Sequence, residues 1–241
     1  MNATVPAPII LAIETSGKAG SVALARGERL IAACSLDPDR RAMATLAPAL
    51  KALLADAGVR PQTLGLVAVT TGPGSFTGLR LGVATAKALA YAAGCGVVGV
   101  NTLAAIAEEA LRETPHKKRP RRVWPVIDAQ RGEFFAACVK AEEDAVARGV
   151  VEVDVLSAEA LRERVAPDDA VVGPGTLRLA RLPSDVSLSP EIAVLDLADP
   201  TPQAATVARL ALRLLAAGRA ESPFTLAPHY FRPSAAEERM R

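Results

Sequence analysis

Cysteine and histidine are scarce in this chain. Among its 241 residues there are three cysteines, Cys34, Cys95 and Cys138, and two histidines, His116 and His229. The cysteines are isolated and odd in number, with no Cys-x-x-Cys pair, which excludes a disulfide framework or a zinc knuckle and fits a reducing cytoplasm. The histidines are too far apart for a local His-x-x-x-His metal pair. We therefore expect a cytoplasmic protein without a metal site.

Strong net charge and long apolar runs are also missing. The formal net charge is +2, whereas a dedicated nucleic-acid-binding protein usually has a large basic surplus on one face. No uncharged apolar run reaches the roughly 18 residues that span a bilayer, and the N-terminus lacks the basic region of a signal peptide. The chain is 50% hydrophobic and 22% charged, a globular composition sufficient for one core or two smaller lobes. We expect no membrane association.

Strand-like and helix-like segments alternate along the chain. Short β-prone runs at 8–14, 20–26 and 29–36 predict an antiparallel meander. A helical pattern over 41–57 then precedes a strand at 66–71, and further helices follow over about 77–93 and 102–113. This order is typical of an α/β protein.

The second half of the chain repeats this order. The strand that ends at Asp128 leads into a hairpin, and a later strand runs into Gly173-Pro174-Gly175-Thr176, as 66–71 runs into Gly72-Pro73-Gly74-Ser75. The repetition predicts an internally duplicated fold with two lobes facing each other across a cleft. We expect an N-terminal lobe over 1–101, a C-terminal lobe over 102–226, a tail over 227–241, and a helix at 201–217 that could pack across the lobes.

The loop Gly72-Pro73-Gly74-Ser75 has the composition of a phosphate-binding turn. Glycines before a helix let backbone N–H groups converge on one point, and the helix dipole favours an anion there. The loop nevertheless matches neither standard motif: Thr77 stands where G-x-G-x-x-G needs glycine, and Leu79-Arg80 replace the Lys-Ser/Thr of a P-loop. A phosphate cradle and a capped turn without a ligand both remain open.

An acidic residue ends the first strand of each predicted lobe. In two-lobed phosphotransferases such an acid holds hydrated Mg²⁺ while the hairpin turn wraps the phosphates. A polar turn without a ligand is the alternative. The candidate nucleotide cleft, active or vestigial, comprises Glu14, Thr15, Ser16, Gly72, Gly74, Ser75 and Asp128.

Small residues recur at every fourth position of the helix at 77–93. Such a stripe lets another helix approach closely, and that helix could be 41–57 of this chain or could belong to a partner. The candidate partner interface comprises Leu46, Leu50, Leu53, Gly78, Leu79, Gly82, Val83, Ala86 and Ala90. A third candidate is the loop 116–122, which has five cations in seven residues and could contact RNA, although such loops are usually solvated.

Four segments together resemble the TsaB (YeaZ) family: Ile10 to Ser16, Gly72 to Gly82, Ile127 to Glu133, and Pro228 to Arg232. The resemblance implies a duplicated two-lobed fold of the actin, Hsp70 and sugar-kinase type, which is ribonuclease H-like. It implies a role in making N6-threonylcarbamoyladenosine at position 37 of tRNAs that read ANN codons. Within that pathway the family binds and activates TsaD, acts with TsaE, and contacts tRNA through the complex.

The resemblance also implies a non-catalytic subunit. TsaD shares the Glu-Thr-Ser opening but adds a metal-binding histidine motif that this chain lacks. The family docks through the helices at about 41–57 and 77–93, and forms homodimers through the same surface when TsaD is absent. We thus expect no catalytic residue and no cofactor held by this chain alone, with ATP and Mg²⁺ acting at the level of the complex. The alternative is a small actin-like ATPase or kinase that binds ATP-Mg²⁺ in the cleft.

Overall fold

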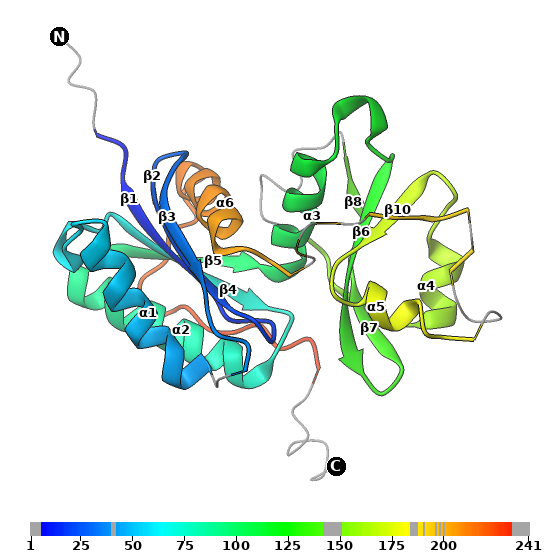
Figure 1. The fold of residues 1–241 in the computed structure, drawn as a ribbon, viewed down its shortest axis with the longest axis horizontal. Coiled ribbons are helices and arrows are strands. Elements are labelled where there is room, and N and C mark those ends of the chain that lie inside the picture. The colour runs from blue at the N-terminus through cyan, green and yellow to red at the C-terminus, as the bar shows by residue number, and fades with distance from the viewer. Residues whose placement is uncertain are drawn as a thin grey trace.

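The computed structural model describes residues 6–39, 42–141, 151–183, 188–189, 191–195, 197, 199 and 201–232. These residues form two β-sheets that stand side by side, each with helices packed against it (Figure 1). The chain enters the second sheet through helix α3 (Thr102–Glu113) and returns to the first through helix α6 (Ala204–Ala216). The predicted two-lobed α/β architecture is confirmed. The lobe boundaries at 101 and 226 stay predictions, and the part of the predicted tail beyond 232 lies outside the described residues.

The first sheet has the strand order β3-β2-β1-β4-β5. Its first three strands form the predicted antiparallel meander, and the last two run parallel to β1. The bounds are β1 (Ile9–Glu14), β2 (Ser21–Arg26), β3 (Arg29–Ser35), β4 (Leu66–Gly72) and β5 (Gly96–Asn101). The central strands β1 and β4 are covered on both faces, which explains their nearly continuous apolar sequences.

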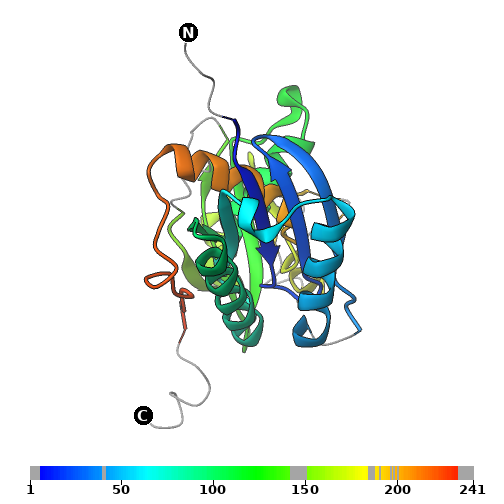
Figure 2. The same ribbon diagram turned by 90° about the vertical axis from the view of Figure 1, so that its left-hand side faces the viewer.

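Helices cover both faces of this sheet (Figure 2). Successive side chains of β1 point to opposite faces: Leu11 and Ile13 pack under α1 (Ala42–Asp56) and α2 (Phe76–Ala93), whereas Ile10 and Ala12 belong to the core beneath α3 and α6. The long helix α2 has a complete set of end signals. Ser75 caps its N-terminus, and Gly94 ends it in the left-handed conformation at φ 68°.

The second sheet has the strand order β11-β10-β6-β7-β9, with β8 also paired to β6. The β6–β7 hairpin and the strand β10, which precedes the turn at Gly173, stand where the repeated pattern predicted them. Two short helices and two 3₁₀ turns complete the described elements. The bounds are η1 (Pro61–Thr63), η2 (His116–Lys118), β6 (Arg122–Gln130), β7 (Glu133–Ala136), β8 (Val139–Lys140), β9 (Asp154–Ser157), α4 (Ala158–Arg164), β10 (Asp169–Val172), α5 (Thr176–Leu179) and β11 (Ala193–Val194).

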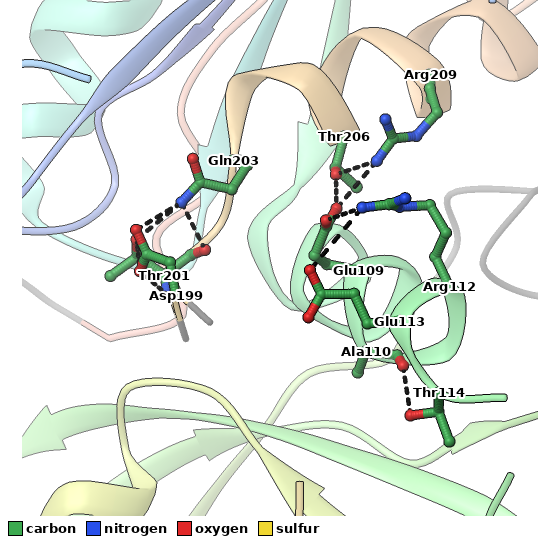
Figure 3. Close-up of polar contacts among 10 residues, drawn as sticks. All are labelled: Glu109, Ala110, Arg112, Glu113, Thr114, Asp199, Thr201, Gln203, Thr206 and Arg209. Carbon is green, nitrogen blue, oxygen red and sulfur yellow. Dashed lines mark hydrogen bonds and ion pairs between the residues drawn. The ribbon is translucent and has the colours of Figure 1, made fainter. Parts of the chain in front are cut away.

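A buried ionic cluster joins α3 to α6 (Figure 3). Glu109 is 7% exposed and accepts hydrogen bonds from the hydroxyl of Thr206, from Arg209 at 3.0 Å and from Arg112 at 2.6 Å. Burial lowers the pKa of the Arg209 guanidinium, yet its ion pair with Glu109 compensates the buried carboxylate and the partly buried guanidinium. We call this cluster the α3–α6 junction. It ties the helix that leads into the second sheet to the helix that lies on the first.

No helix among the described residues has both the length and the apolar character needed to cross a membrane.

Candidate functional site

A cavity of about 760 Å³ lies between the two lobes. The first lobe contributes the turn after β1, at 16–18, and the start of α2, at 73–76 and 79. The second contributes the end of β6, at 127–130, with Phe135 and Pro174. The remaining wall is the tail segment 229–232. The cavity is the cleft that the repeated pattern predicted.

Only some of the residues predicted for a nucleotide cleft line the cavity. Ser16, Gly74, Ser75 and Asp128 line the cavity. The other three do not: Glu14, Thr15 and Gly72 are buried behind its wall. The reason is the close packing of the turn after β1 against the glycine loop.

The glycine loop is bonded to this chain's own β1 turn. The N–H of Ser75 donates to the carbonyl of Ser16 at 2.7 Å, and the N–H of Gly78 donates to the Ser75 hydroxyl at 3.2 Å. A Cβ added to Gly74 would lie 2.5 Å from the Ser16 carbonyl oxygen. Glycine is therefore required for the turn and the loop to touch, and two donors that a phosphate would need are already used.

The stripe of small residues on α2 has the same internal explanation. A Cβ added to Gly78 would lie 1.9 Å from the carbonyl oxygen of Thr15, and one added to Gly82 would lie 2.2 Å from the Thr15 hydroxyl. That hydroxyl donates to the carbonyl of Gly78 at 2.8 Å. The element that approaches this face of α2 is thus the β1 turn of the same chain.

Glu14 is fully buried at the end of β1. Its Oε1 accepts hydrogen bonds from the Ser16 N–H at 2.6 Å, from the Ser16 hydroxyl, and from Thr70 at 3.4 Å, while Oε2 has no partner. Desolvation raises the pKa of Glu14 to about 7 against the opposing effect of the Ser16 hydrogen bonds. A carboxylate that holds hydrated Mg²⁺ must reach the water around the ion, and buried Glu14 does not fit that role here.

Asp128 lines the cavity, but its carboxylate is already paired. It accepts the Gln130 N–H at 2.7 Å and forms an ion pair with Arg178 of α5. The second glycine turn, like the first, packs on its own lobe: Cβ atoms at Gly173 and Gly175 would lie 2.8 and 3.0 Å from the backbone of Val126. Both turns thus serve backbone packing, and Asp128 alone among the predicted acids faces the cavity.

The residues predicted as a partner interface face the interior of the first lobe. All of them are buried, and α1 and α2 turn them onto the first sheet, where Val83, Ala86 and Ala90 share a core with Leu11 and Val69 of the sheet. The sheet covers these side chains, so they are not exposed to a partner in the folded chain, and docking through the two helices stays a prediction. The buried residues are Leu46, Leu50, Leu53, Gly78, Leu79, Gly82, Val83, Ala86 and Ala90.

The opposite face of the same two helices is exposed and rich in alanine. We call it the outer helical face. It presents small side chains at helical spacing, which would allow close approach of another helix. Its exposed alanines are Ala44, Ala47, Ala52 and Ala55 on α1 and Ala84, Ala88 and Ala92 on α2. On α2 these small residues are offset by two positions from the buried row at Gly78, Gly82, Ala86 and Ala90.

The basic loop offers fewer cations to solvent than its sequence suggested. Lys117 and Lys118 lie exposed in η2. Arg122, however, starts β6 and pairs with the buried Asp169 at 2.8 Å. Contact between the loop 116–122 and RNA stays a prediction.

The fold and the cleft define a class. A meander followed by two parallel strands, a second sheet with its own hairpin, and a cavity between the lobes are the architecture of the actin-like, ribonuclease H-like α/β proteins. The structure of YeaZ from Pseudomonas aeruginosa superimposes with a TM-score of 0.74 at 28% sequence identity, covering 93% of this chain and 100% of that one.

The family described as "TsaD: tRNA N6-adenosine threonylcarbamoyltransferase" matches residues 38–234. The tRNA threonylcarbamoyladenosine biosynthesis protein TsaB of Escherichia coli K12 is 35% identical over 156 residues, and the match covers 65% of each chain. The same-named protein of Bacillus subtilis 168 is 30% identical over 161 residues, which cover 66% of this chain and 68% of the relative. The chain belongs to the TsaB (YeaZ) family, as its motifs predicted.

Proposed function

We propose that this chain is a partner subunit in the synthesis of tRNA threonylcarbamoyladenosine. In this proposal it binds a TsaD protein, acts together with TsaE, and supports transfer of the threonylcarbamoyl group to adenosine 37 of tRNAs that read ANN codons. It holds no catalytic residue of its own and pairs with a second copy when TsaD is absent. The names of its relatives support the pathway.

The outer helical face is the observation that carries the docking proposal. Seven exposed alanines on two adjacent helices make most of this surface small and apolar, with Lys51 and Arg80 as its exposed long charged side chains. Small side chains let two helices pack at short interaxial distance, so that the buried area per residue is high. The same surface would serve TsaD in the heterodimer and a second copy in the homodimer.

The state of the cleft supports a role without catalysis by this chain. Glu14 is buried, Asp128 is paired with Arg178, and the N–H groups of Ser75 and Gly78 are bonded to the chain itself. The alternative, an ATPase or kinase that binds ATP-Mg²⁺ between the lobes, requires these groups to be free. Calorimetric titration with ATP-Mg²⁺ separates the two functions, because strong binding by the isolated chain would favour the alternative.

Heterodimer formation tests the proposal. Sedimentation velocity of this chain mixed with a TsaD protein should show a complex, and Ala88→Glu on the outer helical face should weaken it by about 100-fold, because a buried unpaired carboxylate costs several kcal/mol. Ala216→Glu is the matched control, since Ala216 is exposed on α6 of the other sheet face. Failure of the wild-type chain to form any complex would contradict the proposal. If both variants bind TsaD equally well, the interface does not include the outer helical face of α2.

A further inference from the structure

Residues 228–232, which we call the strap, cross from one lobe to the other along the cavity. On the first lobe the His229 N–H donates to the carbonyl of Thr71 at 2.7 Å. The Tyr230 ring lies 4.8 Å from the Phe76 ring, and its hydroxyl accepts a hydrogen bond from Arg80 Nε at 3.0 Å. The strap is thereby attached to the end of β4 and to the first turn of α2.

The other end of the strap is attached to the β6–β7 hairpin of the second lobe. Arg232 donates to the carbonyl of Ala129 at 2.8 Å and forms an ion pair with Glu133 at 2.9 Å. Phe231 packs edge-on against Phe135, with ring centroids 6.4 Å apart. Four consecutive residues thus contact both lobes, and all four line the cavity.

The first lobe has a seat shaped for the strap. The pairing of β4 with β5 shifts register between Thr70 and Gly72, and the carbonyl of Thr71, within that shift, bonds to His229. A Cβ added to Gly72 would lie 2.6 Å from the His229 carbonyl oxygen. The close approach of the strap backbone to β4 therefore requires glycine at position 72.

The two lobes share one hydrophobic core, which includes Ile10 of β1 and Val123 of β6, and two sets of polar contacts of unequal strength reinforce it. At the α3–α6 junction the Glu109 carboxylate is buried and has three donors, so breaking it leaves an uncompensated charge. At the strap, the side chains of Arg232 and Glu133 are 24% and 38% exposed. Arg232 is as buried as Arg209, but the Glu133 carboxylate is more open to solvent than that of Glu109, so salt screens the strap pair more strongly. Of the two connections, the strap is the one that thermal motion breaks more readily.

We propose that the strap is a releasable latch that holds the two lobes closed over the cavity. Release begins at the Arg232–Glu133 pair, frees the hairpin from the first lobe, and widens the cavity while the α3–α6 junction stays intact. The inference concerns this chain alone and is independent of the proposed partner.

Hydrogen exchange and interlobe distances test the latch. Arg232→Ala should raise the exchange rate of the His229 amide roughly tenfold, equivalent to about 1.4 kcal/mol, although the substitution lies three residues away. Spin labels on cysteines introduced at Glu28 and Glu163, exposed in the first and second lobes, should show a longer and broader distance distribution in this variant. The native cysteines are replaced by alanine in every sample.

Arg164→Ala is the matched control. It removes another exposed arginine pair, with Asp154 at 2.7 Å, that lies wholly within the second lobe, and it should leave both readouts at wild-type values. Glu133→Gln and wild-type protein in 0.5 M salt should each loosen the strap in the same direction as Arg232→Ala, and they provide the test if that variant does not fold. An unchanged interlobe distance in the loosened samples, or equal effects of Arg232→Ala and Arg164→Ala, would overturn the proposal.

Discussion

Glu14 makes the stability of this protein depend on pH in a direction opposite to that of a salt-bridged acid. Burial raises its pKa from an ordinary 4.5 to about 7, so the folded state holds a proton that the unfolded state has already released. Below pH 4.5 Glu14 is protonated in both the folded and the unfolded state, so it does not lower the free energy of unfolding. Between pH 4.5 and about 7 the unfolded state binds fewer protons, and the free energy of unfolding falls as the pH rises.

The size of this effect follows from the two pKa values. Their difference, at 1.36 kcal/mol for each pH unit, corresponds to about 3 kcal/mol lost between pH 4.5 and pH 8. Glu14→Gln keeps an oxygen that can accept from Ser16 and cannot ionise, so it imitates the protonated acid. The variant should therefore match the wild type near pH 4.5 and exceed its stability at pH 8 by about 3 kcal/mol.

Urea unfolding followed by circular dichroism, repeated from pH 4.5 to pH 8, measures this difference. Asp154→Asn is the control, because Asp154 is an exposed acid with an ion pair on the surface, and it should keep the wild-type pH dependence. If Glu14→Gln and the wild type lose stability in parallel over this range, the pH dependence does not come from Glu14 and the reasoning fails.

Two further substitutions test the packing that closes the cleft and joins the lobes. Gly78→Ala should destabilise the fold by about 3 kcal/mol, because its Cβ would meet the Thr15 carbonyl oxygen at 1.9 Å. Gly17→Ala, whose Cβ finds its nearest neighbour at 3.7 Å, should change the unfolding midpoint little; equal losses would argue against the packing. Glu109→Ala should cost about 2–3 kcal/mol in urea unfolding, since it leaves the partly buried Arg209 without its carboxylate and the buried Thr206 hydroxyl without its acceptor. A loss below about 1 kcal/mol would count against the junction.

Much of the fold could be read from the sequence. The alternation of strand-like and helix-like runs predicted the meander and the helices, and the helix expected over 77–93 begins one residue earlier, at Phe76. The echo between Gly72-Pro73-Gly74 and Gly173-Pro174-Gly175 predicted the duplication, because a turn that must let two backbones touch needs glycine in both lobes. These strands, helices and glycine turns depend on residues that are close together in the chain, so the sequence indicates them.

The site was less predictable, because its features depend on packing over long separations. On α2, Gly78 and Ala86 in one phase and Ala84 and Ala88 in the other are all small, so residue size alone does not tell the inward face from the outward one. The large apolar Leu79 and Val83 next to the first phase were the signal for burial. The strap's contact with Thr71 joins residues 158 positions apart; the sequence marked Pro228 to Arg232 as a motif but did not indicate what this segment contacts.

The most direct test of the proposed role is reconstitution of tRNA modification from purified components. The full mixture contains this chain, a TsaD protein, TsaE, a source of the threonylcarbamoyl group, ATP and tRNA. We predict modification in that mixture, none with this chain alone, and none when it is omitted or replaced by Ala88→Glu. Equal modification without this chain, or turnover by this chain in isolation, would contradict the account.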